Sequence, residues 1–179
     1  SDLSQWAALS TSQIAGLSSQ QIYDLQTQTL QALSTTQVAA IETADLAVLK
    51  DEGLAALTSL QLQALTTAQV AGLSTQQIQN LNTATLRTFT TVQIASLETR
   101  DIAVLNQLQM QVLTANQVAS LTSTQVSSLN SSSISYLTTL QIGAIETTDF
   151  AALSTSILPT LNSSQLGALS SAQVEALSS

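Results

Sequence analysis

Apolar residues recur every eight positions along almost the whole chain. One set, here called the first comb, runs from Leu9 to Leu177 and holds Leu at nearly every step. A second comb lies five residues further on, runs from Ile14 to Val174, and is apolar throughout. A fixed period of this kind is typical of repeat proteins. The chain is therefore divided into eight-residue units, or octads, with the first comb at position 1 and the second at position 6.

The eight-residue period excludes both a continuous helix and a regular strand. An uninterrupted helix would turn the apolar stripe by about 80° per octad, because eight residues exceed two turns. A strand would place positions 1 and 6 on opposite faces. The scarcity of Gly and the abundance of Ala, Leu and Gln favour helix. A β-solenoid stays a minor alternative.

Polar residues beside the combs predict where each helix begins. Ser10 can cap a helix by accepting from the amide of Gln13, whose side chain can reach back to the amide of Ser10. Leu9 and Ile14 then form the apolar pair that brackets such a start. Ser, Thr or Asn follows the first comb in 17 of 22 octads, so each octad is predicted to start a new short helix.

One octad is too small to fold alone. Ordering eight residues costs roughly 8–16 kcal/mol, whereas two buried aliphatic side chains and a cap return only about 4–7 kcal/mol. Neighbouring octads must cover each other, which predicts an all-α superhelical solenoid of very short capped helices, one per octad. We expect one repeat domain over 1–179, of about 21 octads and cut from a longer array, with Leu and Ile inward and Ser, Thr and Gln outward.

A coarser repeat overlies the octads. IETADLAVL at 41–49 returns as LETRDIAVL at 97–105 and as IETTDFAAL at 145–153. The first spacing is seven octads and the second is six, so both are whole numbers of octads. Two readings stay open: the module marks one turn of the superhelix, or it records the duplication of a block of octads without geometric meaning.

Acidic residues concentrate in this module. They stand at the cap and three residues later, as the pairs Glu42 and Asp45, Glu98 and Asp101, and Glu146 and Asp149. Stacked pairs would offer oxygen ligands to calcium. Alternatively, carboxylates in a first helical turn complement its free amides and dipole without any ion. Capping is favoured, because two carboxylates per site are too few for a calcium cage.

A few apolar residues lie away from the combs. Leu60, Val92, Leu108 and Leu140 occupy position 4, which is otherwise polar. We expect them to widen the core, with an exposed groove for a partner as the alternative. Pro159 interrupts an octad and predicts a local irregularity.

Composition removes several classes of function. The chain has neither Cys nor His, so thiolate and imidazole chemistry and the usual zinc and haem sites are not expected, and no cofactor is predicted beyond the calcium alternative. Its net charge of -8 disfavours nucleic acid and anionic lipid. Apolar runs are too short for a membrane span. Hydroxyls lack a base, and paired carboxylates on repeated convex turns do not form a cleft, so we expect no enzyme.

The words LTTAQVAGL (65–73) and LSTTQVAAI (33–41) resemble tandem octads of very large, repeat-rich bacterial exoproteins, often labelled as adhesins, haem-utilisation or calcium-binding exoproteins. The resemblance covers the whole chain. It implies a structural or interaction domain that is secreted or on the bacterial cell surface, acting as a spacer, stalk or scaffold. A secreted effector or toxin segment that binds a host protein, and a cation-dependent adhesion module, are alternatives. Partners would be another protein or the array itself, through its apolar ends.

The assignment of faces predicts that Leu81→Asn unfolds neighbouring octads, because it places an amide on the first comb. Gln79→Ala, two residues away and off both combs, should change stability by less than about 0.5 kcal/mol. Urea melts of the two variants measure the difference. Equal losses from both would defeat the assignment.

Overall fold

The computed structural model describes residues 3–153 and 155–176. The chain divides into two compact units, Ser1–Phe89 (unit 1) and Thr90–Ser179 (unit 2), and each is described by itself. The boundary falls directly after a first-comb residue, before the cap of the next helix. The expectation of a single repeat domain is not tested by this division.

Both units consist of very short helices, about one per octad, as the spacing of caps predicts. Unit 1 holds α1 (Leu3–Ala7), α2 (Thr11–Ala15), α3 (Ser19–Tyr23), α4 (Thr27–Ala32), α5 (Thr35–Ala39), α6 (Thr43–Leu46), α7 (Asp51–Ala56), α8 (Ser59–Ala64), α9 (Thr67–Ala71), α10 (Thr75–Asn80) and α11 (Thr83–Thr88). Unit 2 holds α12 (Thr91–Ser96), α13 (Thr99–Ala103), α14 (Gln107–Val112), α15 (Ala115–Ala119), α16 (Ser123–Ser127), α17 (Ser131–Tyr136), α18 (Thr139–Ala144), α19 (Thr147–Phe150), the 3-10 helix η1 (Thr155–Thr160), α20 (Ser163–Gly167) and α21 (Ser171–Ala176). Strands are absent from the described residues, so the β-solenoid alternative is wrong.

Reciprocal caps begin many of these helices, as predicted. The amide of Gln13 donates to the Ser10 hydroxyl (3.2 Å), and the amide of Ser10 donates to the side-chain oxygen of Gln13 (2.8 Å). The same box forms at Thr66 and Gln69 in α9 and recurs along both units. Each helix ends within about two turns because the next cap residue is extended; Ser18, for example, has φ -78° and ψ 157°.

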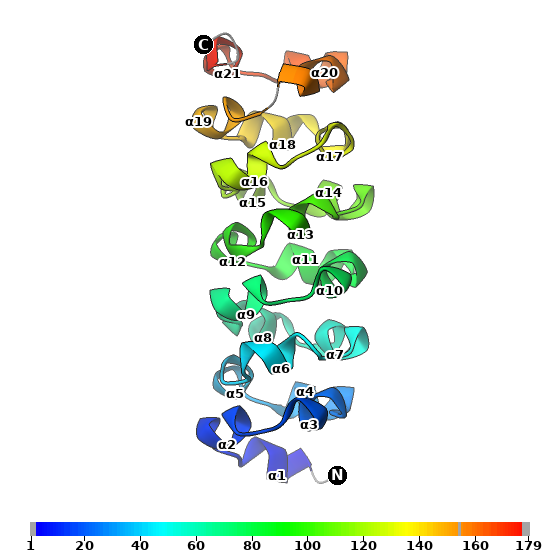
Figure 1. Ribbon diagram of the computed structural model, residues 1–179, viewed down its shortest axis with the longest axis vertical. Helices are drawn as coiled ribbons and strands as arrows, with labels where there is room; N and C mark the ends of the chain where they lie inside the picture. The colour runs from blue at the N-terminus through cyan, green and yellow to red at the C-terminus, as the bar shows by residue number, and fades with distance from the viewer. Residues whose placement is uncertain (1–2, 154, 177–179) are drawn as a thin grey trace. The chain divides into compact units, whose positions relative to one another are not determined.

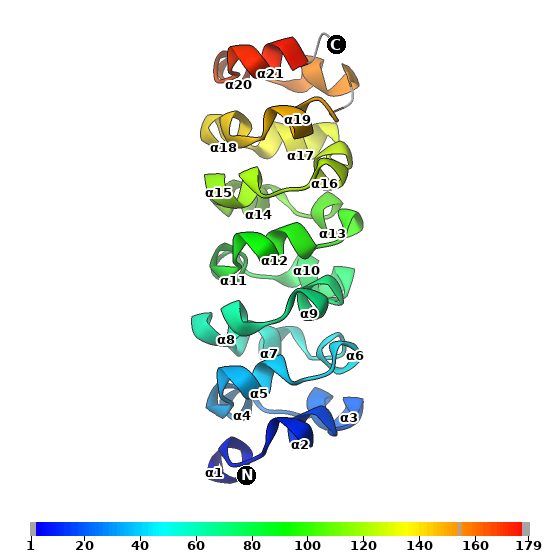
Figure 2. The same ribbon diagram turned by 90° about the vertical axis from the view of Figure 1, so that its left-hand side faces the viewer.

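Helices three octads apart pack against each other. In unit 1 the contacts join α1, α4 and α7 in one stack, α2, α5, α8 and α11 in a second, and α3, α6 and α9 in a third. Unit 2 repeats the pattern, with α12, α15 and α18 in one stack and α13, α16 and α19 in another. Figures 1 and 2 show the stacked helices within each unit from two sides. Each unit is thus a solenoid of short helices.

Glutamine at position 5 links successive turns of each solenoid. The side-chain amide of Gln61 donates to the carbonyl oxygens of Leu30 (2.8 Å) and Leu33 (2.7 Å), at the end of a helix four octads earlier. Gln69, Gln77, Gln125, Gln141, Gln165 and Gln173 repeat this pair of bonds at the same separations of 31 and 28 residues. We call this series the glutamine ladder. These side chains are buried, so the prediction that Gln faces outward is wrong at position 5.

The ladder fixes the length of a superhelical turn. A helix packs against the helix three octads away and bonds to the one four octads away, so one turn takes about 28 residues, or three and a half octads. The six-octad spacing within the coarse module is not a whole number of such turns. The reading of that module as one turn is therefore wrong.

The two combs form the core. Every first-comb residue from Leu33 to Leu161 is buried, as is every second-comb residue from Ile14 to Phe150. Phe150, the largest of the fully buried side chains, takes the second-comb place in α19. Leu and Ile therefore face inward as predicted.

Several octads depart from the pattern, among them those of Lys50 and Pro159. Lys50 stands at the cap of α7 without a side-chain capping bond, and the buried Gly53 takes the glutamine position. Near the other end, the octad with Pro159 forms the 3-10 helix η1 instead of an α-helix. The irregularity predicted at Pro159 is confirmed, and its cause is the missing amide and the ring of proline.

Gly72 shows how closely two turns approach. A Cβ atom built on Gly72 would overlap the Thr43 methyl group, which lies one turn earlier in α6, whereas a Cβ atom on Gly167 would meet nothing within 4 Å.

Gly72→Ala should therefore cost about 1–3 kcal/mol, because the added methyl group must displace Thr43. Gly167→Ala, also at a helix end, should be neutral or gain up to about 1 kcal/mol. Thermal melts of both variants, and of Gly72→Ala combined with Thr43→Ser, give the comparison. A cost at Gly72 that the second substitution fails to relieve would count against the close approach.

Candidate functional site

The first acidic pair lies in α6, where its two members have different surroundings. Glu42 is exposed at the cap position and makes no side-chain capping bond. Asp45 takes the glutamine position and is only 6% exposed. The hydroxyl of Ser19, on the preceding turn in α3, donates to Asp45 Oδ1. Asp45 thus joins two turns, as a ladder glutamine does, but as an acceptor.

The third acidic pair, in α19, has the same arrangement. Glu146 is exposed at the cap and makes no side-chain capping bond. Asp149 is 9% exposed and accepts a hydrogen bond from the hydroxyl of Ser123 in α16. The recurrence in both units shows that the module has a local structural meaning: Asp at position 5 accepts from a serine 26 residues earlier.

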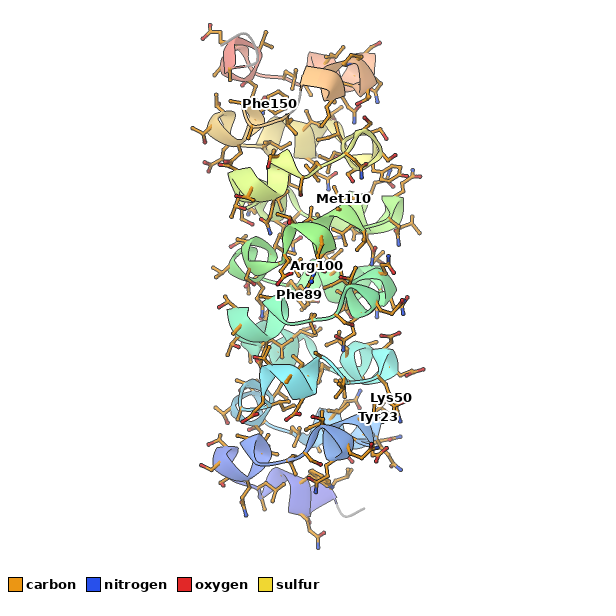
Figure 3. The ribbon with its side chains drawn as sticks, in the orientation of Figure 1. Tyr23, Lys50, Phe89, Arg100, Met110 and Phe150 are labelled. Atoms are coloured by element: carbon orange, nitrogen blue, oxygen red, sulfur yellow. The ribbon has the colours of Figure 1, made fainter. Side chains whose placement is uncertain are left out.

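The second acidic pair is organised around an arginine. Arg100 Nε lies 2.8 Å from Glu98 Oε2 and 3.9 Å from Asp101 Oδ1. The side chains of Arg100 and Glu98 are largely exposed, so their ion pair contributes at most about 1 kcal/mol. Asp101 is fully buried. In Figure 3, Arg100 marks this place on α13.

A shared cation site would require the acidic pairs to stack on one another. In unit 2 they do not. Helix α16 packs against both α13 and α19 and so separates Glu98 and Asp101 from Glu146 and Asp149. Within the described residues, no three acidic side chains gather into a group able to hold a metal ion. Calcium binding by Glu42, Asp45, Glu98, Asp101, Glu146 or Asp149 stays a prediction. The capping bonds expected of the glutamates do not form, because Glu42, Glu98 and Glu146 make no side-chain capping bond. The bonds from Ser19 and Ser123 give Asp45 and Asp149 a structural role of another kind, between turns.

The structural role predicts that calcium leaves stability unchanged. Adding about 2 mM CaCl2 should shift the melting temperature by less than about 1 °C, since a ligand that does not bind the folded state cannot stabilise it. MgCl2 at equal ionic strength is the control. A rise of several degrees with calcium alone, lost in Asp45→Asn and Asp149→Asn, would establish a cation site instead.

The apolar residues at position 4 lie on the surface. Leu60, Val92, Leu108 and Leu140 are 71%, 63%, 67% and 79% exposed, so the expectation that they widen the core is wrong. Position 4 precedes the buried position 6 by two residues, or about 200° around a helix, and so points away from the core. All four residues are exposed, as the alternative requires, and the groove for a partner stays a prediction.

One hollow on unit 1 was not predicted from the sequence. It encloses about 330 Å³, is open to solvent, and is lined by Ser19, Gln20, Tyr23 and Val48. Lys50 Nζ lies 4.4 Å from the centre of the Tyr23 ring, a cation–π contact. Figure 3 labels both residues. One sign was present in the sequence: Tyr23 places an aromatic ring at position 7, and the octad that begins at Leu49 is unusual.

The described helices include none with the length and apolar character that crossing a membrane would require.

This geometry defines the class of protein: a solenoid whose eight-residue unit holds one short helix of four to six residues. The model of the ALTTAQ repeat matches residues 38–75, 94–131 and 142–179, which together make up more than half of the chain. The chain therefore belongs to the ALTTAQ repeat family, and its tandem-repeat character is established. Successive matches are offset by seven and then six octads, the same spacings as in the coarse module. No curated protein and no solved structure matches the chain.

Proposed function

We propose that this chain is a non-enzymatic structural and interaction domain, a spacer, stalk or scaffold of a secreted or surface-associated bacterial protein. The observation that carries the proposal is the use of polar side chains. Cap hydroxyls bind the amides of their own helix, and ladder glutamines bind the turn before. The hydroxyl and amide groups that could take part in a reaction are used to stabilise the fold.

The regular ladder supports a stiff element. Each glutamine of the ladder makes two hydrogen bonds of 2.7–3.1 Å to the turn before it, so bending a unit would break several buried polar contacts at once. The chain has only 8% charged residues, so its surface is hydrated mainly by uncharged Ser, Thr and Gln, which suits a spacer. Low Lys and Arg content and the absence of Cys fit export.

The runner-up, an effector or toxin segment that binds a host protein, draws on unit 2. Leu108 in α14 and Leu140 in α18 are both largely exposed, and Gln141, beside Leu140, donates to the carbonyl oxygens at the end of α14. The two leucines thus lie on neighbouring turns. An exposed apolar pair of this kind suits contact with a protein.

Spin labels test the stiffness. Asn116 and Ala172 are exposed residues of unit 2, and the chain has no Cys of its own, so Asn116→Cys with Ala172→Cys gives one specific pair. A scaffold predicts one narrow distance distribution in buffer, which broadens in urea. A broad distribution in buffer would contradict it.

Location needs a separate test. In the producing bacterium, an antibody against the chain should stain intact cells or find it in the medium, and external protease should remove the stain. Recovery from the cytoplasm alone would refute the surface assignment.

A further inference from the structure

The hollow of about 330 Å³ on unit 1 has the size of a small-molecule site, for which about 300–1,000 Å³ is usual. Tyr23 in α3 and Val48, which follows α6 on the next turn, line it together with Ser19 and Gln20. Tyr23 and Val48 are 44% and 42% exposed. Lys50 Nζ lies over the Tyr23 ring, and Figure 3 labels both residues. An aromatic ring, an aliphatic side chain and polar groups thus meet at one place on the surface.

The fold does not require the side chains that shape this hollow. The serine-to-aspartate hydrogen bond between α3 and α6 recurs in unit 2 between α16 and α19. In that second copy, Ser127 and Ala152 occupy the places of Tyr23 and Val48. The same bond between turns therefore forms with small side chains at both places. The ring and the isopropyl group of unit 1 are thus not explained by the packing of the solenoid.

Position 7 of the octad, where Tyr23 stands, faces solvent and the turn after. Gln31 holds this position in α4, is exposed, and donates to the carbonyl oxygen of Ala56, 25 residues later (3.0 Å). Tyr23 and Val48 are the same 25 residues apart. Gln63 in α8 is exposed at position 7 as well, although α5 and α11 both pack against α8. The hollow therefore lies between two turns of unit 1 and does not depend on what precedes α3.

The polar groups beside the ring are already held in place. The Ser19 hydroxyl donates to Asp45, so its oxygen can accept a hydrogen bond from a ligand. The side-chain amide of Gln20 donates to Asp24 Oδ2 (2.8 Å), and its carbonyl oxygen is a further acceptor. The ammonium group of Lys50 lies against the ring. Because these contacts order the side chains beforehand, a ligand loses less free energy in fixing them.

The charges and polar groups around the hollow favour a neutral, hydroxyl-rich ligand. Asp24 and Asp45 are bonded to two of its lining residues, and the chain carries a net charge of -8, so an anion would be repelled. An organic cation would meet the like charge of Lys50 on the ring. A purely apolar molecule would displace water from Ser19 and Gln20 without replacing its hydrogen bonds.

We propose that this hollow binds a neutral saccharide unit. A sugar ring carries apolar C–H groups that pack against Tyr23 and Val48, and hydroxyl groups that donate to the oxygens of Ser19 and Gln20. Binding of this kind needs no metal ion. The inference goes beyond the proposed scaffold and does not rest on it: the scaffold concerns the stiffness of the solenoid, and the saccharide concerns one place on unit 1.

An NMR titration of the isotope-labelled, full 179-residue chain in EDTA tests the proposal. The probes are the methyl β-glycosides of glucose, galactose and N-acetylglucosamine, each up to about 50 mM, because an open site of this size predicts a Kd of the order of millimolar. At least one should shift the amide signals of α3 and of residues 46–50 in a saturable way. Cyclohexanol, a ring with a single hydroxyl, should bind at least about tenfold more weakly.

The β-linked disaccharide of the sugar that binds identifies the source of the ligand. Binding as tight as that of the monosaccharide, or tighter, would support a unit of a glycan chain. Loss of binding would support a free monosaccharide.

Tyr23→Ser copies the residue that unit 2 has at this place, so the fold should be kept while the affinity falls by at least about tenfold. Val48→Ala, which also copies unit 2, should weaken binding several-fold. Tyr136→Ser is the matched control, since it makes the same substitution away from the hollow and should bind like the wild type. Unchanged circular dichroism melts would show that the variants are folded.

Three results would each overturn the proposal: no saturable shift from any of the three glycosides, cyclohexanol binding as tight as that of the best sugar, or Tyr136→Ser as defective as Tyr23→Ser. The spin-label distance within unit 2 tests the scaffold separately. A narrow distance distribution in a chain that binds no sugar would therefore refute the saccharide site alone.

Discussion

The buried glutamine at position 5 is the interaction on which the solenoid depends. Its oxygen accepts from the cap amide of its own helix, its backbone amide donates to the cap side chain, and its amide nitrogen donates to two carbonyl groups one turn earlier, as Gln69 does with Thr66, Val38 and Ile41. Very short helices leave many carbonyl groups free at their ends. The glutamine satisfies these groups inside the core, where an unsatisfied one would cost about 1–3 kcal/mol.

The same constraint explains where the pattern varies. Asp45 and Asp149 cannot donate as an amide does, and a serine hydroxyl from the preceding turn donates to them instead. Gly53 has no side chain at this position. Side-chain atoms of Leu30 and Leu49 lie 3.0 Å from the place where its Cβ would be. The combs and the ladder thus act together: apolar side chains exclude water from the axis, and buried polar groups fix the length of each turn.

Much of this architecture could be predicted from residue spacing, because capping and comb burial are local consequences of sequence. The ladder could not, since it joins residues that lie a whole superhelical turn apart in the chain. One sign was present: position 5 holds Gln or Asp in 16 of 21 octads and never Glu, although Glu caps as well as Gln. A donor aimed at the carbonyl groups of the turn before favours Gln over Glu, and where Asp stands instead, at Asp45 and Asp149, a serine hydroxyl of the preceding turn donates to the carboxylate. The exposure of Leu60 and its counterparts was misjudged because their apolar character was weighed above the rotation around the helix that separates position 4 from position 6.

The most direct measurement compares Gln69→Glu with Gln13→Glu at pH 7 and low protein concentration. Both keep a capping oxygen on a glutamine that closes a box with Ser or Thr, but only Gln69 is buried against carbonyl groups of another turn. The glutamine ladder predicts a loss of about 3–5 kcal/mol in the free energy of unfolding for Gln69→Glu, from a buried charge facing carbonyl oxygens, and less than about 0.5 kcal/mol for Gln13→Glu. Equal, small losses from both would contradict the account.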